Sequence, residues 1–218
     1  VEVLGSLDMV GCRVEGEFGR FDLDGRAVRV TGSNASLSAK NSSFFSSEGN
    51  GLVVREGGKA ENVDECDLSG CVGDGVRVQG KESSACLRHC RVDDCEFINI
   101  CVGDGAKANV EHTTSNGSTF GSGFYVSGSG SCFEATDSES SRNAMFGAYA
   151  CSSSAITLLR SSSGGNGVHG WVAAKSSSLT AKDSRSLCNK EGNAIERLGG
   201  RIAVHDACDL GGQVIQKK

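Results

Sequence analysis

Proline is absent from this sequence of 218 residues, although it is an ordinary component of soluble domains. Proline cannot donate a backbone hydrogen bond to a neighbouring strand, so it is confined to sheet edges and turns. A chain without proline therefore suits a fold in which nearly every strand lies inside a sheet. The absence itself indicates nothing about chemistry.

The sequence also lacks an excess of positive charge and any long apolar segment. Lysine and arginine total 22 against 27 aspartates and glutamates, which gives a net charge of -5 and a pI near 5.4. No basic cluster is present, which argues against binding to a phosphate backbone. No apolar stretch approaches the ~18 residues of a membrane-spanning helix, and the N-terminal residues lack the pattern of a signal peptide. We therefore expect no nucleic-acid partner and no direct membrane insertion.

A short apolar motif recurs at a fixed interval through most of the chain. Copies begin at positions 27, 51, 75, 99, 123 and 147, so the spacing is constant, and further copies begin at 170 and 193. The second and fourth residues of each copy are almost all apolar, whereas the residue between them varies. Because side chains alternate across a strand, each copy predicts a short strand with the same face buried. The second positions are Val28, Leu52, Val76, Ile100, Phe124, Ala148 and Trp171.

A second strand is expected about nine residues after the first in each copy. Its predicted buried column consists of Ala60, Ala108, Cys132, Ile156, Leu179 and Ile202. A third, weaker strand includes Phe44, Leu68 and Val92. Short strands separated by corners rich in Gly, Ser and Asn are typical of a coil of parallel strands. A leucine-rich repeat is the other fold with this period, but the Leu-x-x-Leu-x-Leu pattern is missing.

The periodicity and strands of the GVxV type, such as residues 75–78, resemble the right-handed parallel β-helix repeat family, the pectate-lyase-like superfold. The resemblance covers roughly residues 26 to 208 and concerns the fold. It implies an all-β chain, a single-stranded right-handed parallel β-helix of about eight to nine turns of 23 to 24 residues. We expect one domain over residues 1–218, with an N-terminal cap or irregular turns at 1–25, regular coils at 26–208 and a C-terminal cap at 209–218.

The eleven cysteines cannot all pair within the chain, because their number is odd. Cys66 and Cys90 are separated by one period of the repeat, as are Cys71 and Cys95, so a disulfide between neighbouring turns is geometrically possible. The favoured interpretation is that small thiols fill a narrow core, which indicates a reducing compartment such as the cytosol or an organelle interior. Secretion is the alternative, because three Asn-x-Ser sequons are present. They are at Asn34, Asn41 and Asn116.

The best metal candidate combines Cys86, His89 and Cys90 with Cys66 one turn below, because zinc prefers four nitrogen or sulfur ligands. Residues 86 and 90 have the same strand parity and residue 89 does not. We therefore expect His89 to point outward and the thiols to belong to the core. No metal and no cofactor is predicted.

Several carboxylates are available for acid–base chemistry or calcium binding. They are Asp64, Asp67, Asp74, Asp93, Asp94 and Asp104. Asp67 precedes Arg91 by one period of the repeat, which predicts an ion pair across turns. The resemblance implies that an enzyme of this family would use calcium-binding or clustered aspartates beside long loops, but the steady repeat leaves no room for such loops. We predict no catalytic residues.

Asn143, Asn166 and Asn189 end three successive turns, and the two intervals between them are equal. Amide side chains stacked at the same corner can hydrogen-bond from turn to turn. The spacing predicts an internal asparagine ladder with a structural role. An amide row that binds sugar is the functional alternative.

The outward column of the first strands is unusually apolar for a surface that faces solvent. It contains Arg29, Val53, Arg77, Cys101, Tyr125, Tyr149 and Val172. Tyrosine and arginine are enriched in protein interfaces, and monomers avoid continuous apolar strips. We predict that Arg77, Tyr125, Tyr149 and Val172 bind another protein or a second copy.

These features favour a non-enzymatic structural scaffold or protein-interaction module, such as an accessory subunit of a larger assembly. The same coil also serves lyases and hydrolases, so the fold assigns no activity. The alternative function is a carbohydrate-active β-helix protein, either a polysaccharide lyase or hydrolase or a sugar-binding module. Carbohydrate is the alternative partner, because exposed aromatic rings also bind sugars.

Overall fold

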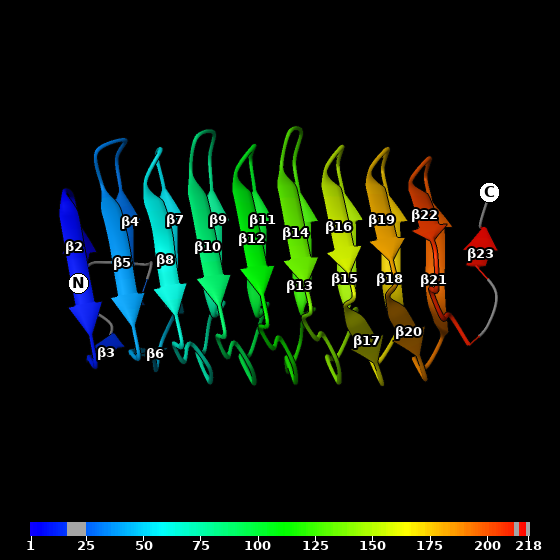
Figure 1. The fold of residues 1–218 in the computed structure, drawn as a ribbon, viewed down its shortest axis with the longest axis horizontal. Coiled ribbons are helices and arrows are strands. Elements are labelled where there is room, and N and C mark those ends of the chain that lie inside the picture. The colour runs from blue at the N-terminus through cyan, green and yellow to red at the C-terminus, as the bar shows by residue number, and fades with distance from the viewer. Residues whose placement is uncertain (17–24, 212–213, 217–218) are drawn as a thin grey trace.

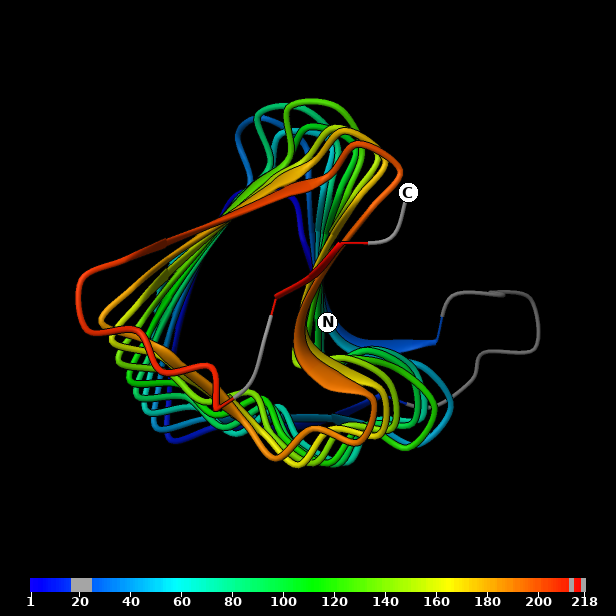
Figure 2. The ribbon, with the colours of Figure 1, turned by 90° about the vertical axis from the view of Figure 1, so that its right-hand side faces the viewer.

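The computed structural model describes residues 1–16, 25–211 and 214–216, and β-strands are the regular elements of these residues (Figure 1). Each turn adds one strand to a ten-stranded sheet, sheet A, and one to a nine-stranded sheet, sheet B. All pairings are parallel, and the turns superimpose around a three-sided outline when viewed along the rod (Figure 2). The expected all-β coil of parallel strands is confirmed.

Sheet A consists of β1 (Glu2–Val3), β4 (Arg26–Thr31), β7 (Asn50–Arg55), β9 (Val76–Gln79), β11 (Ile100–Gly103), β13 (Phe124–Ser127), β15 (Ala148–Cys151), β18 (His169–Ala174), β21 (Gly192–Arg197) and β23 (Val214–Gln216). Sheet B consists of β2 (Ser6–Val10), β5 (Ser36–Lys40), β8 (Lys59–Asp64), β10 (Ser84–Arg88), β12 (Lys107–Glu111), β14 (Cys132–Thr136), β16 (Ala155–Leu159), β19 (Ser178–Lys182) and β22 (Arg201–His205). The third side carries β3 (Arg13–Gly16), β6 (Ser43–Ser46), β17 (Ser162–Gly164) and β20 (Arg185–Leu187). Single bridges continue it between β6 and β17.

The register of sheet A follows the sequence repeat. Val54 pairs with Val78 and Val78 pairs with Val102, and all three side chains are fully buried. The third side contributes Phe44, Leu68 and Val92 to the same core. One continuous hydrophobic core therefore runs along the rod axis, as the alternation of apolar residues predicts.

Sheet B departs from the constant interval at several turns, and the pairing of β12 with β14 is one of them. Ala108 pairs with Phe133, whereas Cys132 pairs with Lys107 and is exposed. Phe133 is buried and packs on Phe124 with ring centroids 4.8 Å apart. The corner between β13 and β14 is one residue longer than the corner between β11 and β12. The predicted place of Cys132 in the buried column is therefore wrong.

The corner after sheet B turns on one residue in the left-handed conformation, followed by a hydroxyl or thiol that is buried at every turn except the last, where Cys208 is half-buried and comes after Ala207. Ser161 is typical: its Oγ accepts a hydrogen bond from the backbone N–H of Ser138 at 3.2 Å and donates to the carbonyl of Leu159 at 2.9 Å. This column comprises Ser42, Cys66, Cys90, Thr113, Ser138, Ser161, Ser184 and Cys208. Cys66 and Cys90 therefore occupy positions that serines fill in other turns.

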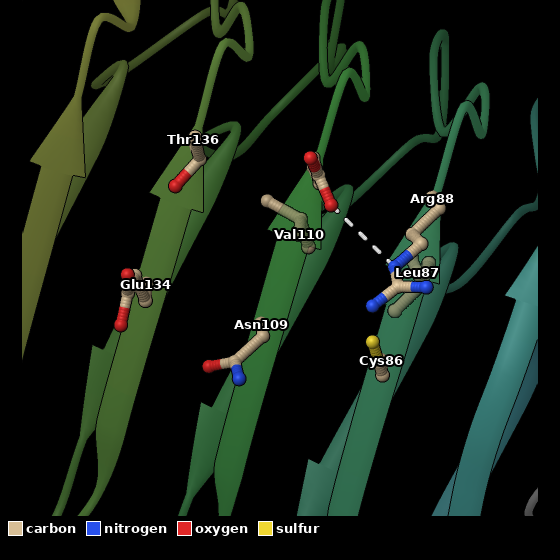
Figure 3. A pocket seen from close by; sticks show the side chains of 8 residues that line it. Cys86, Leu87, Arg88, Asn109, Val110, Glu134 and Thr136 are labelled. Carbon is tan, nitrogen blue, oxygen red and sulfur yellow. Dashed lines mark ion pairs between the residues drawn. The ribbon is translucent and has the colours of Figure 1, made fainter.

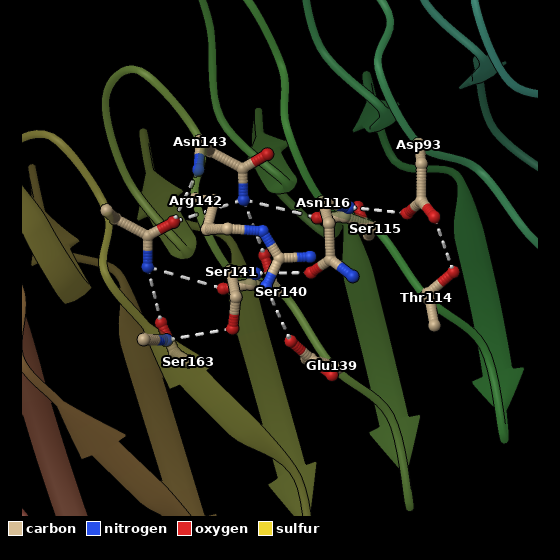
Figure 4. Close-up of polar contacts among 12 residues, drawn as sticks. Asp93, Thr114, Ser115, Asn116, Glu139, Ser140, Ser141, Arg142, Asn143 and Ser163 are labelled. Atoms are coloured by element: carbon tan, nitrogen blue, oxygen red, sulfur yellow. Dashed lines mark hydrogen bonds and ion pairs between the residues drawn. The ribbon is translucent and has the colours of Figure 1, made fainter.

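The predicted asparagine ladder is present at the corner before sheet A (Figure 4). The backbone N–H of Asn143 donates to Oδ1 of Asn166 at 3.0 Å, and Asn166 does the same to Asn189 at 3.0 Å. Their Nδ2 groups also donate upward, at 3.1 and 2.8 Å. Gly147 leaves the space for this packing, because a Cβ there would lie 2.9 Å from Nδ2 of Asn166.

The described residues contain no helix long and apolar enough to cross a membrane.

We predict that Asn166→Ala lowers the free energy of unfolding by about 3 kcal/mol, because it leaves several buried hydrogen-bonding groups without partners. Asn109→Ala is the matched control, since Asn109 is exposed on β12, and it should change stability by less than about 0.5 kcal/mol. Urea denaturation followed by circular dichroism measures both. Equal effects of the two substitutions would contradict the role of the ladder.

Candidate functional site

Three large apolar side chains are exposed in the middle of the rod, where the third side leads into sheet A. Phe97, Phe120 and Met145 are 54%, 62% and 41% exposed. They come from adjacent turns, because the N–H of Phe120 donates to the carbonyl of Glu96 at 2.8 Å. The two phenylalanine rings are 6.4 Å apart and tilted by 56°. We call these three residues the apolar ridge.

Two of the residues predicted to bind a partner lie beside this ridge. Tyr125 on β13 and Tyr149 on β15 are register partners, with ring centroids 5.5 Å apart and planes at 75°. Phe146 follows Met145 in the chain and packs edge-on against Tyr149 at 4.9 Å. The tyrosine pair is therefore connected through Phe146 to the corner of the coil that carries Met145. We call the ridge and the two tyrosines together the aromatic surface.

Val172 does not share this exposure. Its side chain is 1% exposed and packs in a cluster with Phe146 and Ile195, against which Tyr149 also lies. Val53 and Cys101 in the same outward column are buried as well. The expected exposure of Val172 is wrong, because strand parity shows which face a residue takes but not that Phe146 packs against that face.

Arg77 lies on the outer face of sheet A and forms an ion pair with a buried carboxylate. Its Nε and Nη2 atoms are each 2.8 Å from Oδ2 of Asp74, which is 1% exposed. The N–H of Ile98 donates to Oδ1 of Asp74 at 3.0 Å. Burial raises the pKa of Asp74, although Arg77 and this N–H act in the opposite direction. The ion pair fixes the position of Arg77 at the edge of the aromatic surface.

The phenols of Tyr125 and Tyr149 and the thiol of Cys101 have raised pKa values and are neutral at physiological pH. Oη of Tyr125 lies 3.4 Å from Sγ of Cys151. Burial raises the pKa of both Tyr125 and Tyr149, and burial raises the pKa of the Cys101 thiol to about 12. Neutral groups are poor nucleophiles, so the arrangement suits contact better than covalent chemistry.

The outer face of sheet B is polar and shallowly hollowed (Figure 3). Arg88 pairs with Glu111 at 3.5 Å beside a depression of 230 Å³, and Lys40 pairs with Asp64 at 3.3 Å beside an adjoining depression of 310 Å³. Both depressions reach Cys86. None of the described residues that line them is a Phe, Tyr or Trp, so this face lacks an aromatic platform.

The residues considered for zinc are distributed over three places. Cys66 and Cys90 are buried in the column of hydroxyl and thiol groups at the corner after sheet B. Cys86 lies on the outer face of β10, and Nδ1 of His89 lies 3.1 Å from Oδ1 of Asp64 at the exposed corner. The left-handed conformation of His89 reverses the alternation, so Cys86 and Cys90 do not share a face as parity predicted. Over residues 1–16, 25–211 and 214–216, no three His, Cys, Asp or Glu side chains converge on a metal-binding position.

The candidate carboxylates do not gather into an acid–base pair. Arg91 lies opposite Asp67 on the neighbouring turn, but its guanidinium contacts Asp93 at 3.0 Å and Asp94 at 3.2 Å. Asp93 also accepts hydrogen bonds from the N–H of Asn116 at 2.7 Å and from Oγ1 of Thr114 at 3.0 Å (Figure 4). The predicted ion pair between Asp67 and Arg91 is replaced by one within the turn. Two further aspartates lie at other corners, namely Asp64 and Asp104.

The apolar ridge was not predicted, although the sequence contains a signal for it. Phe97, Phe120 and Met145 follow one another at intervals close to the period of the repeat. They precede the strand motif by two or three residues, at corners where the alternation of a strand no longer applies. A search for large apolar residues recurring at the period outside the strands would have identified them.

Residues 26–117 match the protein family described as "Right handed beta helix region". The observed coil extends beyond this match with the same pairing through β22. No curated protein and no solved structure matches the chain. The predicted right-handed parallel β-helix is therefore confirmed, and the comparisons assign no activity to it.

We predict that Asp74 titrates above the ordinary value of 3.8 and that Arg77→Met raises its pKa further, because the guanidinium stabilises the carboxylate. Native Asp74 holds its proton more tightly than the unfolded chain does. Its contribution to the free energy of unfolding therefore decreases as the pH rises from 3.8 through the folded pKa. Carboxyl carbon NMR measures the midpoint.

Asp137 is the internal reference for this titration. Nη2 of Arg160 lies 2.6 Å from its Oδ2, and this arginine lowers the pKa of the Asp137 carboxyl. The two midpoints should therefore lie on opposite sides of 3.8. An Asp74 midpoint at or below that of Asp137 would contradict the assignment of burial as the dominant cause.

Proposed function

We propose that this right-handed parallel β-helix is a non-enzymatic scaffold that docks another protein, as an interaction module or accessory subunit of a larger assembly. The observation that supports this function is the aromatic surface in the middle of the rod. Contiguous exposed apolar side chains are unusual on a monomer. Tyr, Phe and Met are also the residues that dominate the buried centres of protein interfaces.

The rigidity of the coil favours such a role. Each residue of the surface belongs to a turn that is hydrogen-bonded to the turns on both sides. Neighbouring contact residues are therefore held one strand spacing apart, at ~4.8 Å. A partner that meets a preformed surface loses less conformational freedom on binding, which leaves more of the contact energy as affinity.

The orientation of the rings favours a protein over a sugar. A sugar ring packs flat on the face of an aromatic ring, so a polysaccharide platform needs ring faces turned to the same side. Tyr125 and Tyr149 are instead at 75°, and Phe97 and Phe120 are at 56°. Rings arranged in this way leave notches between them, and apolar side chains of a partner can fill such notches.

The alternative function, a carbohydrate-active protein, finds support in the polar depressions of sheet B. Amide, carboxylate and guanidinium groups line them, and such groups hydrogen-bond to sugar hydroxyls. A panel of polysaccharides assayed with and without calcium tests this alternative. Turnover that disappears in Glu111→Ala or Glu134→Ala, two carboxylates that line a depression, would favour it over docking.

We also propose that the protein works in a reducing intracellular compartment. Cys66 and Cys90 fill serine positions of a buried hydrogen-bonded column, which supports a role as free thiols. The sequon at Asn116 is buried, and its Oδ1 accepts a hydrogen bond from the N–H of Ser141 at 2.6 Å. Attachment of a glycan to Nδ2 needs an accessible side chain, and Asn116 is 6% exposed.

We predict that replacing Tyr125 and Tyr149 with Ser weakens binding of the docked protein by about 2 kcal/mol or more, as expected for interface hot spots. The partner is first identified by a photo-crosslinking phenylalanine analogue at Phe120, with Thr157 on β16 of sheet B as the control position. Calorimetry with the purified partner then measures the loss of affinity.

Phe97→Ser with Phe120→Ser is the second variant, because these side chains are exposed and their replacement should leave the unfolding transition unchanged. An identified partner that binds both double variants with unchanged affinity would exclude the aromatic surface as its docking site. Crosslinks of equal yield from residues 120 and 157 would exclude it as well.

A further inference from the structure

The aromatic surface has an acidic border on the third side of the coil. Carboxylates outnumber guanidinium groups in the segments of turns that lead to the ridge. The carboxylates are Asp93, Asp94, Glu96 and Glu139, and the guanidinium groups are those of Arg91 and Arg142. Both arginines already have carboxylate partners, since Arg91 contacts Asp93 and Asp94 and Arg142 lies 3.8 Å from Glu139. The border therefore retains a negative excess.

Glu96 is the carboxylate closest in sequence to the ridge, and its charge is not compensated locally. It precedes Phe97, and its carbonyl accepts the N–H of Phe120 from the next turn. Within the described part of the chain, no Lys, Arg or His forms an ion pair with it. Asp94, two residues earlier, has a side chain that is 64% exposed despite its contact with Arg91. One exposed carboxylate, Asp94, and one half-buried carboxylate, Glu96, thus lie in the segment that leads to the exposed ring of Phe97.

The opposite border, on sheet A, carries less negative charge. Arg77 lies 2.8 Å from Asp74, and Arg197 acts electrostatically on the phenol of Tyr149 and contacts Nε2 of His169 at 3.3 Å. The charge that an approaching partner meets at the ridge is therefore negative, and the net charge of the chain, -5, has the same sign.

We propose that the docked partner presents large apolar side chains flanked by lysine or arginine, with the cations placed at Glu96 and Asp94. This inference rests on the proposed docking function and adds the chemistry of the partner. Opposite charges at the rim of an apolar contact speed encounter and fix its register. An acidic partner, or a second copy with the same acidic border, would bring like charges together, which selects against both.

Two short synthetic peptides test this chemistry on the intact protein. They share the same spaced Leu and Phe residues, and the remaining positions are all Lys in one and all Glu in the other. Fluorescence anisotropy at low and physiological salt measures binding. The Lys peptide should bind about 10-fold or more tightly than the Glu peptide, and salt should weaken it.

Glu96→Gln with Asp94→Asn should weaken the Lys peptide about 10-fold and flatten its salt dependence. Asparagine suits position 94, because Asp94 has a φ of 56° and asparagine tolerates this left-handed conformation. Glu61→Gln with Glu134→Gln is the matched control, since it removes two exposed carboxylates from sheet B. This control should leave the affinity within about 2-fold.

The possible results separate this inference from the docking function. Equal affinities of the two peptides would overturn the inference. So would equal losses of affinity in Glu96→Gln with Asp94→Asn and in the control variant. If the inference is overturned but Phe97→Ser with Phe120→Ser abolishes binding of either peptide, the proposed docking function is still supported. If the phenylalanine variant binds both peptides as the unchanged protein does, the docking surface fails. Sedimentation that shows a dimer lost in the same variant would identify a second copy as the occupant, and would overturn the inference too.

Discussion

In-register hydrogen bonding between successive turns is the constraint on which the whole molecule depends. Every residue in a column has its counterparts directly above and below it, so each side chain must fit the neighbours one turn away. Asn166 illustrates this: it bonds to Asn143 and Asn189 at the same corner, and it fits because Gly147, the residue before β15, has no side chain. The ladder and the glycine column are therefore one device, and neither can change alone.

An asparagine can stand in the glycine column instead of the ladder column, as long as its side-chain oxygen still accepts the same backbone hydrogen bond. At one turn the glycine position is Asn99, and its Oδ1 accepts the N–H of Cys95, as the ladder asparagines do elsewhere. The facing ladder position there is the small Ser118, which accommodates the larger Asn99. Near the end of the described coil, Oδ1 of Asn193 likewise accepts a hydrogen bond from the backbone N–H of Asn189. What the fold requires is an amide oxygen in a fixed place, and two columns of the sequence can supply it.

The repeat was sufficient to predict the strands, the buried face and the asparagine ladder, because each depends on spacing within one or two turns. Phe133 was missed because one extra corner residue shifts the register of sheet B without altering the strand pattern. The burial of Val172 depends on Phe146, which comes from the preceding turn and packs over the outer face of sheet A. The exposed Phe97 lies at a corner where strand alternation does not apply. Contacts between one turn and the outer face of another carry no periodic signal, so they required the structure.

The division between structural and functional residues follows from the same constraint. Asp93 and Asn116 point into the hydrogen-bond network of the third side, and their replacement would disturb neighbouring turns. Phe97 and Glu96 belong to the same segments, but Phe97 is exposed and Glu96, which is half-buried, has no ion-pair partner among the described residues. The hydrogen-bond network therefore does not account for an exposed aromatic ring at position 97. A coil held together by its inward columns is free to vary its outward residues, and the docking partner that we propose would cover the exposed apolar cluster.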